Sequence, residues 1–331
     1  MNTYQNPIYP ATFADPAILR TPEGFYLYGT MGYSDYKGEG KPFLSRGPIL
    51  FSKDLCHYEY VGEIFDDKEF PRWGTKDACL WAPDIIKIGS TYVLYYSLSI
   101  LFDPNASIGV ATSSSPKGPF HDHGPLLRSL EVKVNNSIDP TVFRGYDGQL
   151  YIIWGSYRGI YGSKLSEDGL SLLGEKVALA GFDQGTIDLD TYEASYMVKR
   201  NGLYYLLFST GKTLDGDKCT YHVVSCKSRS PLGPYSDSQG HDMFGRNQGD
   251  LVVDGLANHF VGTGHCCVHA DDAETYWIFY HGVEISPKYP SGASERIMAM
   301  DPLKWDPVSE MPFVEKKLPS YQVVKEGPVL K

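Results

Sequence analysis

Three acidic residues occupy the same place in three similar stretches of the sequence. Asp15 stands second in "ADPAILRTPEGFYLYGT", Asp139 in "IDPTVFRGYDGQLYIIWGS" and Glu193 in "YEASYMVKRNGLYYLLFSTG". One Asp before Pro is common in turns, where its side chain bonds the neighbouring backbone. Carboxyl groups gathered in one partly desolvated site acquire separated pKa values, so that one donates a proton while another accepts one. Glycoside hydrolysis requires such a pair.

Two further stretches share the layout without the acid. They are "WAPDIIKIGSTYVLYYSLS", with Ala82 in second place, and "TGHCCVHADDAETYWIFYHG", with Gly264 there. All five run from a small or acidic residue through an apolar strand, a turn and an aromatic strand to Gly, Ser or Thr. Because Ala82 and Gly264 hold the shared position in two repeats, the layout itself does not demand an acid.

The elements that must position these residues are short strands. β-Branched and aromatic runs separated by Gly, Pro, Asp and Asn extend along the chain, and no long stretch keeps the apolar spacing of a helix. The repeats lie more than fifty residues apart, enough for a four-stranded sheet with its loops. Five such units account for nearly all 331 residues. We therefore predict an all-β chain, a single domain over residues 1–331 folded as a five-bladed β-propeller.

In a propeller the first strand of each blade lines the central axis. Residues that head these strands face one axial cavity although they are far apart in sequence. Asp15, Asp139 and Glu193 are therefore predicted to converge on an active site at one end of the central axis.

Composition narrows the partners. The net charge is −10, with 40 acidic and 30 basic residues, which disfavours nucleic acid and anionic membranes as partners and favours a neutral or cationic ligand. Aromatic residues make up 14% of the chain, including 25 Tyr, and such side chains suit sugar-binding surfaces. No run approaches the roughly 20 apolar residues of a membrane span. The six cysteines form no C-x-x-C pair and are expected to be reduced.

The N-terminal "MNTYQNPIYP" has neither a basic start nor an apolar stretch. We expect a cytoplasmic protein from the chain as written, or a periplasmic or secreted one if a signal was trimmed. The oligomeric state is left open.

The five repeats together resemble glycoside hydrolase family 43, the five-bladed β-propeller arabinanases and xylosidases. Within that family the sequence is most similar to the endo-1,5-α-L-arabinanases, in "IIWGSYRGIYGSKL", "TYHVVSCKSRSPLGPYSD", "FVGTGHCCVHADD" and "ERIMAMDPLKWD". The resemblance implies that Asp15 is the general base, Glu193 the general acid, and Asp139 the residue that adjusts the pKa of the acid and orients it. It also implies an inverting reaction, with base and acid roughly 6.5–9.5 Å apart.

The implied substrate is a neutral plant cell-wall oligosaccharide or polysaccharide with α-1,5-L-arabinofuranosyl linkages. Alternatives within the family are an exo-acting α-L-arabinofuranosidase and a β-xylosidase; an alternative of another class is a non-catalytic carbohydrate-binding propeller. Arabinanases usually have Gly-His-Asn where this chain has Gly264-His265-Cys266, and the departure bears on the substrate. Endo and exo action both remain open.

Three more residues are candidates for binding substrate. Trp81 heads the second repeat and suits stacking on a sugar face, or is a structural aromatic at a blade junction. Ser156 follows the third aromatic strand and is expected to contact sugar hydroxyls. Arg296 resembles the fifth-blade arginine that reaches the −1 sugar and the acid in this family; the alternative is a surface ion pair. Asp84, in "WAPD", is expected to be a buried hydrogen-bonding residue.

His265 resembles the axial histidine beside a hydrated cation, often calcium, so one such ion in the central channel is expected and no organic cofactor. The spacing of "HCCVH" also places His265, Cys267 and His269 on one face of a strand, which suggests zinc. A plain core histidine is the third possibility.

Overall fold

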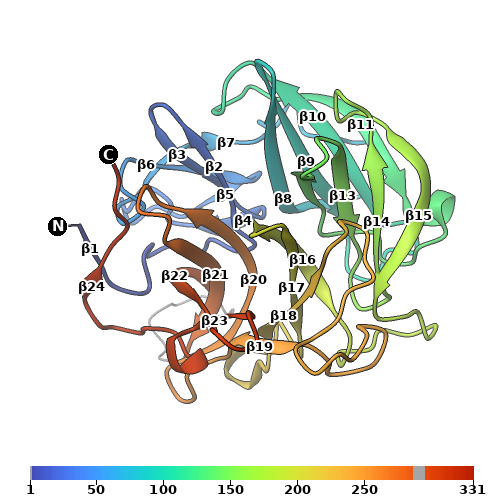
Figure 1. Cartoon of the computed structure of the whole chain (residues 1–331). Helices are drawn as coiled ribbons and strands as arrows, with labels where there is room; N and C mark the ends of the chain where they lie inside the picture. Colours follow the sequence, from blue (N-terminus) through green and yellow to red (C-terminus); the bar gives the residue numbers. More distant parts are fainter. Residues whose placement is uncertain (1, 286–294) are drawn as a thin grey trace.

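The computed structural model describes residues 2–285 and 295–331 and arranges five four-stranded antiparallel sheets as blades around a central axis (Figure 1). In each blade the strands follow one another in chain order from the first. The predicted all-β five-bladed propeller is confirmed.

The strands of the first three blades are consecutive in the sequence apart from an inserted hairpin. Blade 1 contains β2 (Ala17–Thr21), β3 (Gly24–Tyr28), β6 (Pro48–Ser52) and β7 (Glu59–Glu63); blade 2 contains β8 (Cys79–Ile88), β9 (Thr91–Ser99), β10 (Ser107–Ser113) and β11 (His121–Arg128); blade 3 contains β12 (Thr141–Arg144), β13 (Leu150–Trp154), β14 (Ile160–Leu165) and β15 (Leu172–Ala180).

The last two blades follow the same plan. Blade 4 contains β16 (Glu193–Arg200), β17 (Leu203–Thr210), β18 (His222–Ser228) and β19 (Asp250–Val253); blade 5 contains β20 (Phe260–Ala270), β21 (Tyr276–Glu284), β22 (Arg296–Trp305) and β23 (Pro312–Val314). Outside the blades lie the hairpin β4 (Gly32–Ser34) and β5 (Phe43–Ser45), the pair β1 (Thr3–Tyr4) and β24 (Lys325–Glu326), helix α1 (Ser129–Val132), and 3₁₀ turns at Gly216–Lys218 and Glu315–Lys317.

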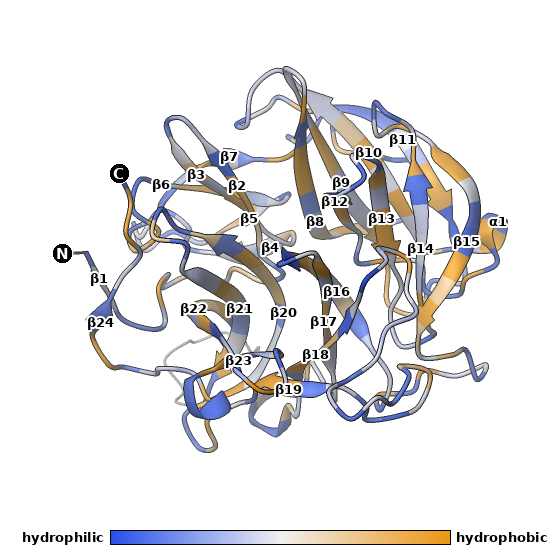
Figure 2. Cartoon of the chain, in the orientation of Figure 1, coloured by the Kyte–Doolittle hydropathy of each residue, from blue (hydrophilic) through white to orange (hydrophobic). Residues whose placement is uncertain are grey.

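The core consists of layers between neighbouring blades. Along β9, Leu94 and Tyr96 pack toward blade 1 with Tyr26, whereas Val93 and Tyr95 pack toward blade 3. Because successive strand residues face opposite sides, a strand between two layers needs apolar residues on both faces. This accounts for the unbroken apolar runs of the second strands, which appear as hydrophobic bands in Figure 2.

The ring closes where blade 5 meets blade 1. The N-terminal segment runs along β22, with Ile8 N donating to Met298 O and Phe13 N to Arg296 O, both at 2.9 Å. β1 pairs antiparallel with β24, so the two ends of the chain lie side by side (Figure 1). Blade 5 is thereby joined to the N-terminal segment that leads into blade 1, which closes the ring of blades.

Across residues 2–285 and 295–331 the protein has no helix with the length and apolar character needed to cross a membrane.

Candidate active site

The axial strand of every blade has a residue in the left-handed conformation, either within the strand or two residues before it. These residues are Asp15 (φ 55°), Ala82 (42°), Asp139 (58°), Ala194 (52°) and His265 (47°). A positive φ is uncommon outside glycine, so its recurrence at all five strand heads marks one structural position. Asp15 and Asp139 share that position, as expected.

Glu193 does not share this position. The expectation that Glu193 and Gly264 occupy the same place as Asp15, Ala82 and Asp139 was therefore wrong by one residue in blades 4 and 5. In three blades the pairing with the second strand is interrupted by a bulge, between Trp81 and Asp84, between Glu193 and Tyr196, and between Gly264 and Cys267. Glu193 and Gly264 therefore correspond to Trp81, one residue ahead of the left-handed residue. The bulge hides this offset from an alignment made on the strands.

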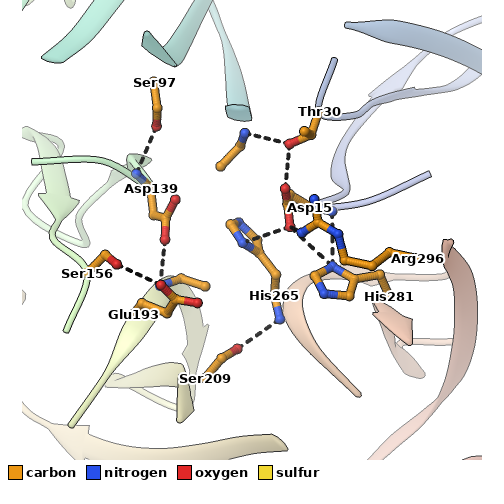
Figure 3. A network of polar contacts seen from close by, with 12 residues as sticks. Asp15, Thr30, Ser97, Asp139, Ser156, Glu193, Ser209, His265, His281 and Arg296 are labelled. Atoms are coloured by element: carbon orange, nitrogen blue, oxygen red, sulfur yellow. Dashed lines mark hydrogen bonds and ion pairs between the residues drawn. The ribbon is translucent and has the colours of Figure 1, made fainter. Parts of the chain in front are cut away.

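The offset separates the acid from the two aspartates. Successive residues of a strand project in different directions. The Glu193 side chain therefore leaves its strand in a different direction from those of Asp15 and Asp139. All three carboxyl groups nevertheless face one central region of the propeller, here called the axial mouth (Figure 3).

The left-handed residues also connect the blades. In four of the five junctions the N–H group of this residue donates to a side chain at the end of the second strand of the preceding blade. The pairs are Ala82 N to Thr30 Oγ1 (2.8 Å), Asp139 N to Ser97 Oγ (3.0 Å), His265 N to Ser209 Oγ (2.8 Å) and Asp15 N to His281 Nδ1 (3.2 Å). The polar residue that ends a repeat is thus a bridge to the next blade.

The junction of blades 3 and 4 is different. Gly155 occupies the bridging place, with its N–H donating to Ile138 O at 2.9 Å. A Cβ there would lie 2.2 Å from Gly159 O, and its φ is +124°, so a side chain is excluded. Ala194 N donates instead to Asp139 Oδ2 at 3.2 Å. Asp139 therefore replaces the missing bridge, which holds its carboxylate beside the strand that carries Glu193.

Asp15 lies among donors and basic groups (Figure 3). Its Oδ1 is 2.9 Å from Arg296 Nη1 and 3.2 Å from Nδ1 of both His265 and His281, while Oδ2 accepts from Thr30. Burial opposes ionisation, but the charge of Arg296 and the two histidines hold the pKa of Asp15 well below its usual range. Burial lowers the pKa of His265 to about 4, so this imidazole is neutral at pH 7 and Arg296 is the cation that keeps Asp15 ionised.

Glu193 and Asp139 have the opposite environment. Glu193 accepts from Ser156 Oγ at Oε2 (2.6 Å) and from Tyr221 Oη at Oε1 (2.7 Å). Burial raises the pKa of Glu193 and that of Asp139, and the negative charge of Glu193 raises the pKa of Asp139 further. Two such carboxyl groups titrate as a unit. The pair therefore keeps a proton to a higher pH than exposed carboxyl groups do, while Asp15 has lost its own.

The predicted binding residues lie around this centre. Arg296 pairs with Asp15, rather than with Glu193, and its side chain is 23% exposed against 7% for Asp15, so the surface ion pair is excluded. Ser156 is buried, and its hydroxyl contacts Glu193; its sugar contact stays a prediction. Trp81 is partly buried at the start of β8, and its stacking role also stays a prediction.

Asp84 is the buried hydrogen-bonding residue expected from the sequence. Its Oδ2 accepts from Val142 N at 2.6 Å, and burial raises its pKa to about 7. It links the axial strands of blades 2 and 3, a structural role.

Three contributors were not foreseen: Thr30, His281 and Tyr221. Thr30 and His281 stand at or next to the end of the first and fifth repeats, so the recurring terminal residue was a signal that could have found them. Tyr221 precedes β18 and lies outside the repeat layout; its approach to Glu193 depends on the pairing of β16, β17 and β18 within blade 4.

A bound metal ion needs several donor groups that lie close together. Among residues 2–285 and 295–331 no three His, Cys, Asp or Glu side chains are grouped to hold a metal ion. Cys267 belongs to the apolar core between blades 5 and 1, and the His269 ring packs edge-on against Phe25 at 5.1 Å. The zinc alternative is therefore wrong for this part of the chain. Calcium prefers six to eight oxygen ligands, so the residues here fit only an ion that keeps most of its water.

Comparison with known proteins agrees with this geometry. The family model described as glycosyl hydrolases family 43 matches residues 4–308. An extracellular exo-α-(1→5)-L-arabinofuranosidase of Cellvibrio japonicus is 27% identical over 330 residues, covering 93% of this chain and 88% of that protein. An extracellular endo-α-(1→5)-L-arabinanase of Bacillus subtilis is 29% identical over 258 residues, covering 76% and 75%.

The fold of this chain is also similar to that of a solved structure. The α-L-arabinanase of Cellvibrio cellulosa, complexed with arabinohexaose, superposes with a TM-score of 0.79 at 25% identity, covering 92% of this chain and 96% of that one. The shared geometry spans all five blades, not a local motif.

Proposed function

The chain belongs to glycosyl hydrolases family 43, and on that premise we propose that it cleaves α-1,5-L-arabinofuranosyl linkages, in arabinan or arabino-oligosaccharides, with inversion. The observation that carries the proposal is the division of the axial carboxyl groups. Asp15 contacts Arg296, which lowers its pKa, whereas Glu193 and Asp139 are buried close to each other, which raises theirs. The substrate follows from relatives that act on α-(1→5)-linked arabinose.

In this mechanism Asp15 accepts a proton from a water molecule as that water attacks the anomeric carbon. The new C–O bond forms as the glycosidic C–O bond breaks, and Glu193 protonates the departing oxygen. Arg296 suits this reaction because it favours the ionised base before the attack.

Asp139 acts on Glu193 in this scheme. Its bond from Ala194 N holds it next to the acid, and a second carboxyl group close to Glu193 disfavours a second negative charge. Trp81, Ser156 and Arg296 are proposed to bind the sugar around this centre, with Ser156 also fixing Glu193.

The axial ion is proposed as a hydrated cation next to His265, with calcium as the first candidate. It would add positive charge at the mouth, and the reaction above takes no step through it. Metal analysis of purified protein before and after chelation tests the site. An ion bound in about equimolar amount and lost from His265→Ala supports it, whereas a metal-free active protein contradicts it.

The test of the function is the product profile on linear 1,5-α-arabinan from the earliest time points. A ladder of oligosaccharides identifies endo action, and arabinose or one short oligomer alone identifies exo action. NMR of the first-formed anomer tests inversion. Release from aryl β-xylosides but not from arabinan overturns the substrate. Binding without turnover on any of these substrates favours the non-catalytic propeller.

A further inference from the structure

Tyr221 and Gly264 meet at the acid from two different blades. Tyr221 lies just before β18 of blade 4, and Gly264 lies in β20 of blade 5. We propose that Tyr221 is a positioning residue that orients the carboxyl group of Glu193, and that Gly264 is glycine because the Tyr221 ring fills the space of a side chain. This inference rests on the proposed role of Glu193 as general acid.

The contacts of Tyr221 hold it in one place. The side chain is 1% exposed, and its hydroxyl donates to Glu193 Oε1 at 2.7 Å. Its ring stacks on the His281 imidazole, with centroids 5.9 Å apart and an interplanar angle of 14°. Because packing already fixes the Tyr221 ring, its hydroxyl loses little further conformational freedom when it forms this hydrogen bond. The bond therefore orients the Glu193 carboxyl group, and Tyr221 does not have to move to reach it.

Gly264 provides the seat for this ring. A Cβ on Gly264 would lie 2.3 Å from both Cδ1 and Cε1 of Tyr221, and 3.1 Å from Ser209 Oγ. Contacts below 3.0 Å are essentially never made by real Cβ atoms. Gly264 is not among the residues with positive φ, so the requirement for glycine comes from space rather than from backbone conformation. Blade 5 therefore carries no side chain where blade 4 carries its acid.

The two donors on Glu193 define how the acid is presented. Tyr221 donates to Oε1 and Ser156 to Oε2, which fixes the plane of the carboxyl group from both ends. Because each oxygen accepts one hydrogen bond, both bonds favour the ionised form of Glu193, and together they fix the orientation in which the acid faces the substrate.

The charges facing Glu193 come from several blades. They are the carboxyl groups of Asp139 and Asp15, the guanidinium of Arg296 and the phenol of Tyr157. Against this background the Tyr221 bond favours the ionised form of Glu193. Loss of that bond should raise the pKa of Glu193, and the pH at which activity falls on the basic side should rise with it.

The first experiment compares Tyr221→Phe with Tyr95→Phe. Tyr95 is an equally buried control whose hydroxyl donates to Gly169 O at 2.9 Å, away from the site. We expect Tyr221→Phe to lower kcat on substrates with a sugar leaving group about 10- to 100-fold, with KM little changed and the basic limb moved to higher pH. An activated aryl glycoside, which needs less protonation, should lose much less. Tyr95→Phe should change none of these.

A wild-type basic limb and the same loss on both leaving groups would overturn the positioning role. So would a Tyr95→Phe variant that reproduces the whole pattern.

The second experiment is a double-mutant cycle on Tyr221 and Gly264. Gly264→Ala should lower kcat as Tyr221→Phe does, because the methyl group displaces the ring. In a Tyr221→Ala background the same methyl group should have little further effect. If the losses are additive, with Gly264→Ala lowering kcat in both backgrounds, then Gly264 is not required to make room for the Tyr221 ring. If Gly264→Ala does not fold, Gly264→Ser in the Tyr221→Ala background gives the same comparison.

Infrared titration of the Glu193 carboxyl group, assigned by difference against Glu193→Gln, needs no turnover. A raised pKa in Tyr221→Phe without any glycosidase activity would retain the contact and remove the proposed function. Activity on arabinan with an unchanged Glu193 band would retain the function and remove the role of Tyr221.

Discussion

Two regions of this propeller bury carboxyl groups in contrasting surroundings, the axial mouth and the seam where the ring closes. At the seam a single carboxylate, Asp301 of β22, accepts hydrogen bonds from groups of both chain ends and of blade 5. They are Tyr4 Oη (3.2 Å), Asn6 Nδ2 (3.2 Å), Tyr280 Oη (2.7 Å) and Ser320 N (3.2 Å), with Lys325 Nζ at 3.9 Å. Burial raises the pKa of Asp301, but its neighbours are donors, not other acids.

At the axial mouth three carboxyl groups lie near one another, but their charged and hydrogen-bonding neighbours differ. Asp15 contacts the cation of Arg296, whereas Glu193 and Asp139 have neutral hydrogen-bond donors and lie close to each other. The difference teaches how to distinguish a structural buried acid from a reactive one. At the seam, one carboxylate accepts hydrogen bonds from several donors, and these bonds hold the chain ends in place. At the axial mouth, several carboxyl groups lie close together, and their unequal surroundings give them different pKa values.

The largest expected effect comes from neutralising an acid in each region. Glu193→Gln and Asp15→Asn should lower kcat/KM about 10²- to 10⁴-fold, and Glu193→Gln should leave the free energy of unfolding within about 1 kcal/mol of the wild type. Asp301→Asn, the matched change at the seam, should keep wild-type kcat/KM. Kinetics on arabinan and urea unfolding measure both. A Glu193→Gln variant that retains normal turnover would remove Glu193 from the mechanism.

Truncation at the seam should affect stability instead of chemistry. Asp301→Ala leaves the buried Tyr4, Asn6 and Tyr280 donors without their acceptor, and we expect it to lower the free energy of unfolding by about 3 kcal/mol. Activity per folded molecule at 25 °C should be unchanged. Chemical unfolding together with active-site titration tests this. Loss of activity at full folding would mean that the seam also shapes the mouth.

A change of the like charge at the mouth should move the pH profile. Asp139→Asn keeps an acceptor for Ala194 N but leaves Glu193 as the one titrating carboxyl group of the pair, so its ionisation no longer places two negative charges side by side. The pKa of Glu193 should fall, so the basic limb of kcat/KM should move to lower pH, with a loss of about tenfold or more at the optimum. Asp301→Asn serves again as the control, with no movement of the limb. A shift to higher pH would contradict the assigned coupling.

The smallest expected effects on activity and stability come from removing the arginine of a buried ion pair and that of an exposed one. Arg296→Met should lower kcat/KM about tenfold, because Asp15 loses the cation beside it. Arg20→Met removes an exposed pair with Asp272, whose nitrogen and oxygen are 2.6 Å apart, and should change stability by less than about 1 kcal/mol and activity not at all. Equal behaviour of the two variants would deny Arg296 its part in the site.

Much of this protein could be predicted from local sequence. Apolar runs with turn residues between them determine strands, because a strand between two blade layers buries both faces. The fivefold recurrence of one layout determines the number of blades, and the acids within it indicated Asp15, Asp139 and Glu193. The arginine and the axial histidine followed from the resemblance to family 43.

What the tertiary structure decided is how these groups face one another. The bulge that sets Glu193 one residue ahead of Asp15 and Asp139 arises from strand pairing, which spacing along the chain does not encode. The Tyr221 bond to Glu193 arises from the pairing of β16, β17 and β18 within blade 4, and the empty side-chain place at Gly264 arises from blades 4 and 5 packing together. Local sequence determines which groups reach the axis, because strand formation depends on near neighbours. Contacts between blades decide their proton affinities, because burial, charge and hydrogen bonding depend on residues that are distant in sequence and close in space.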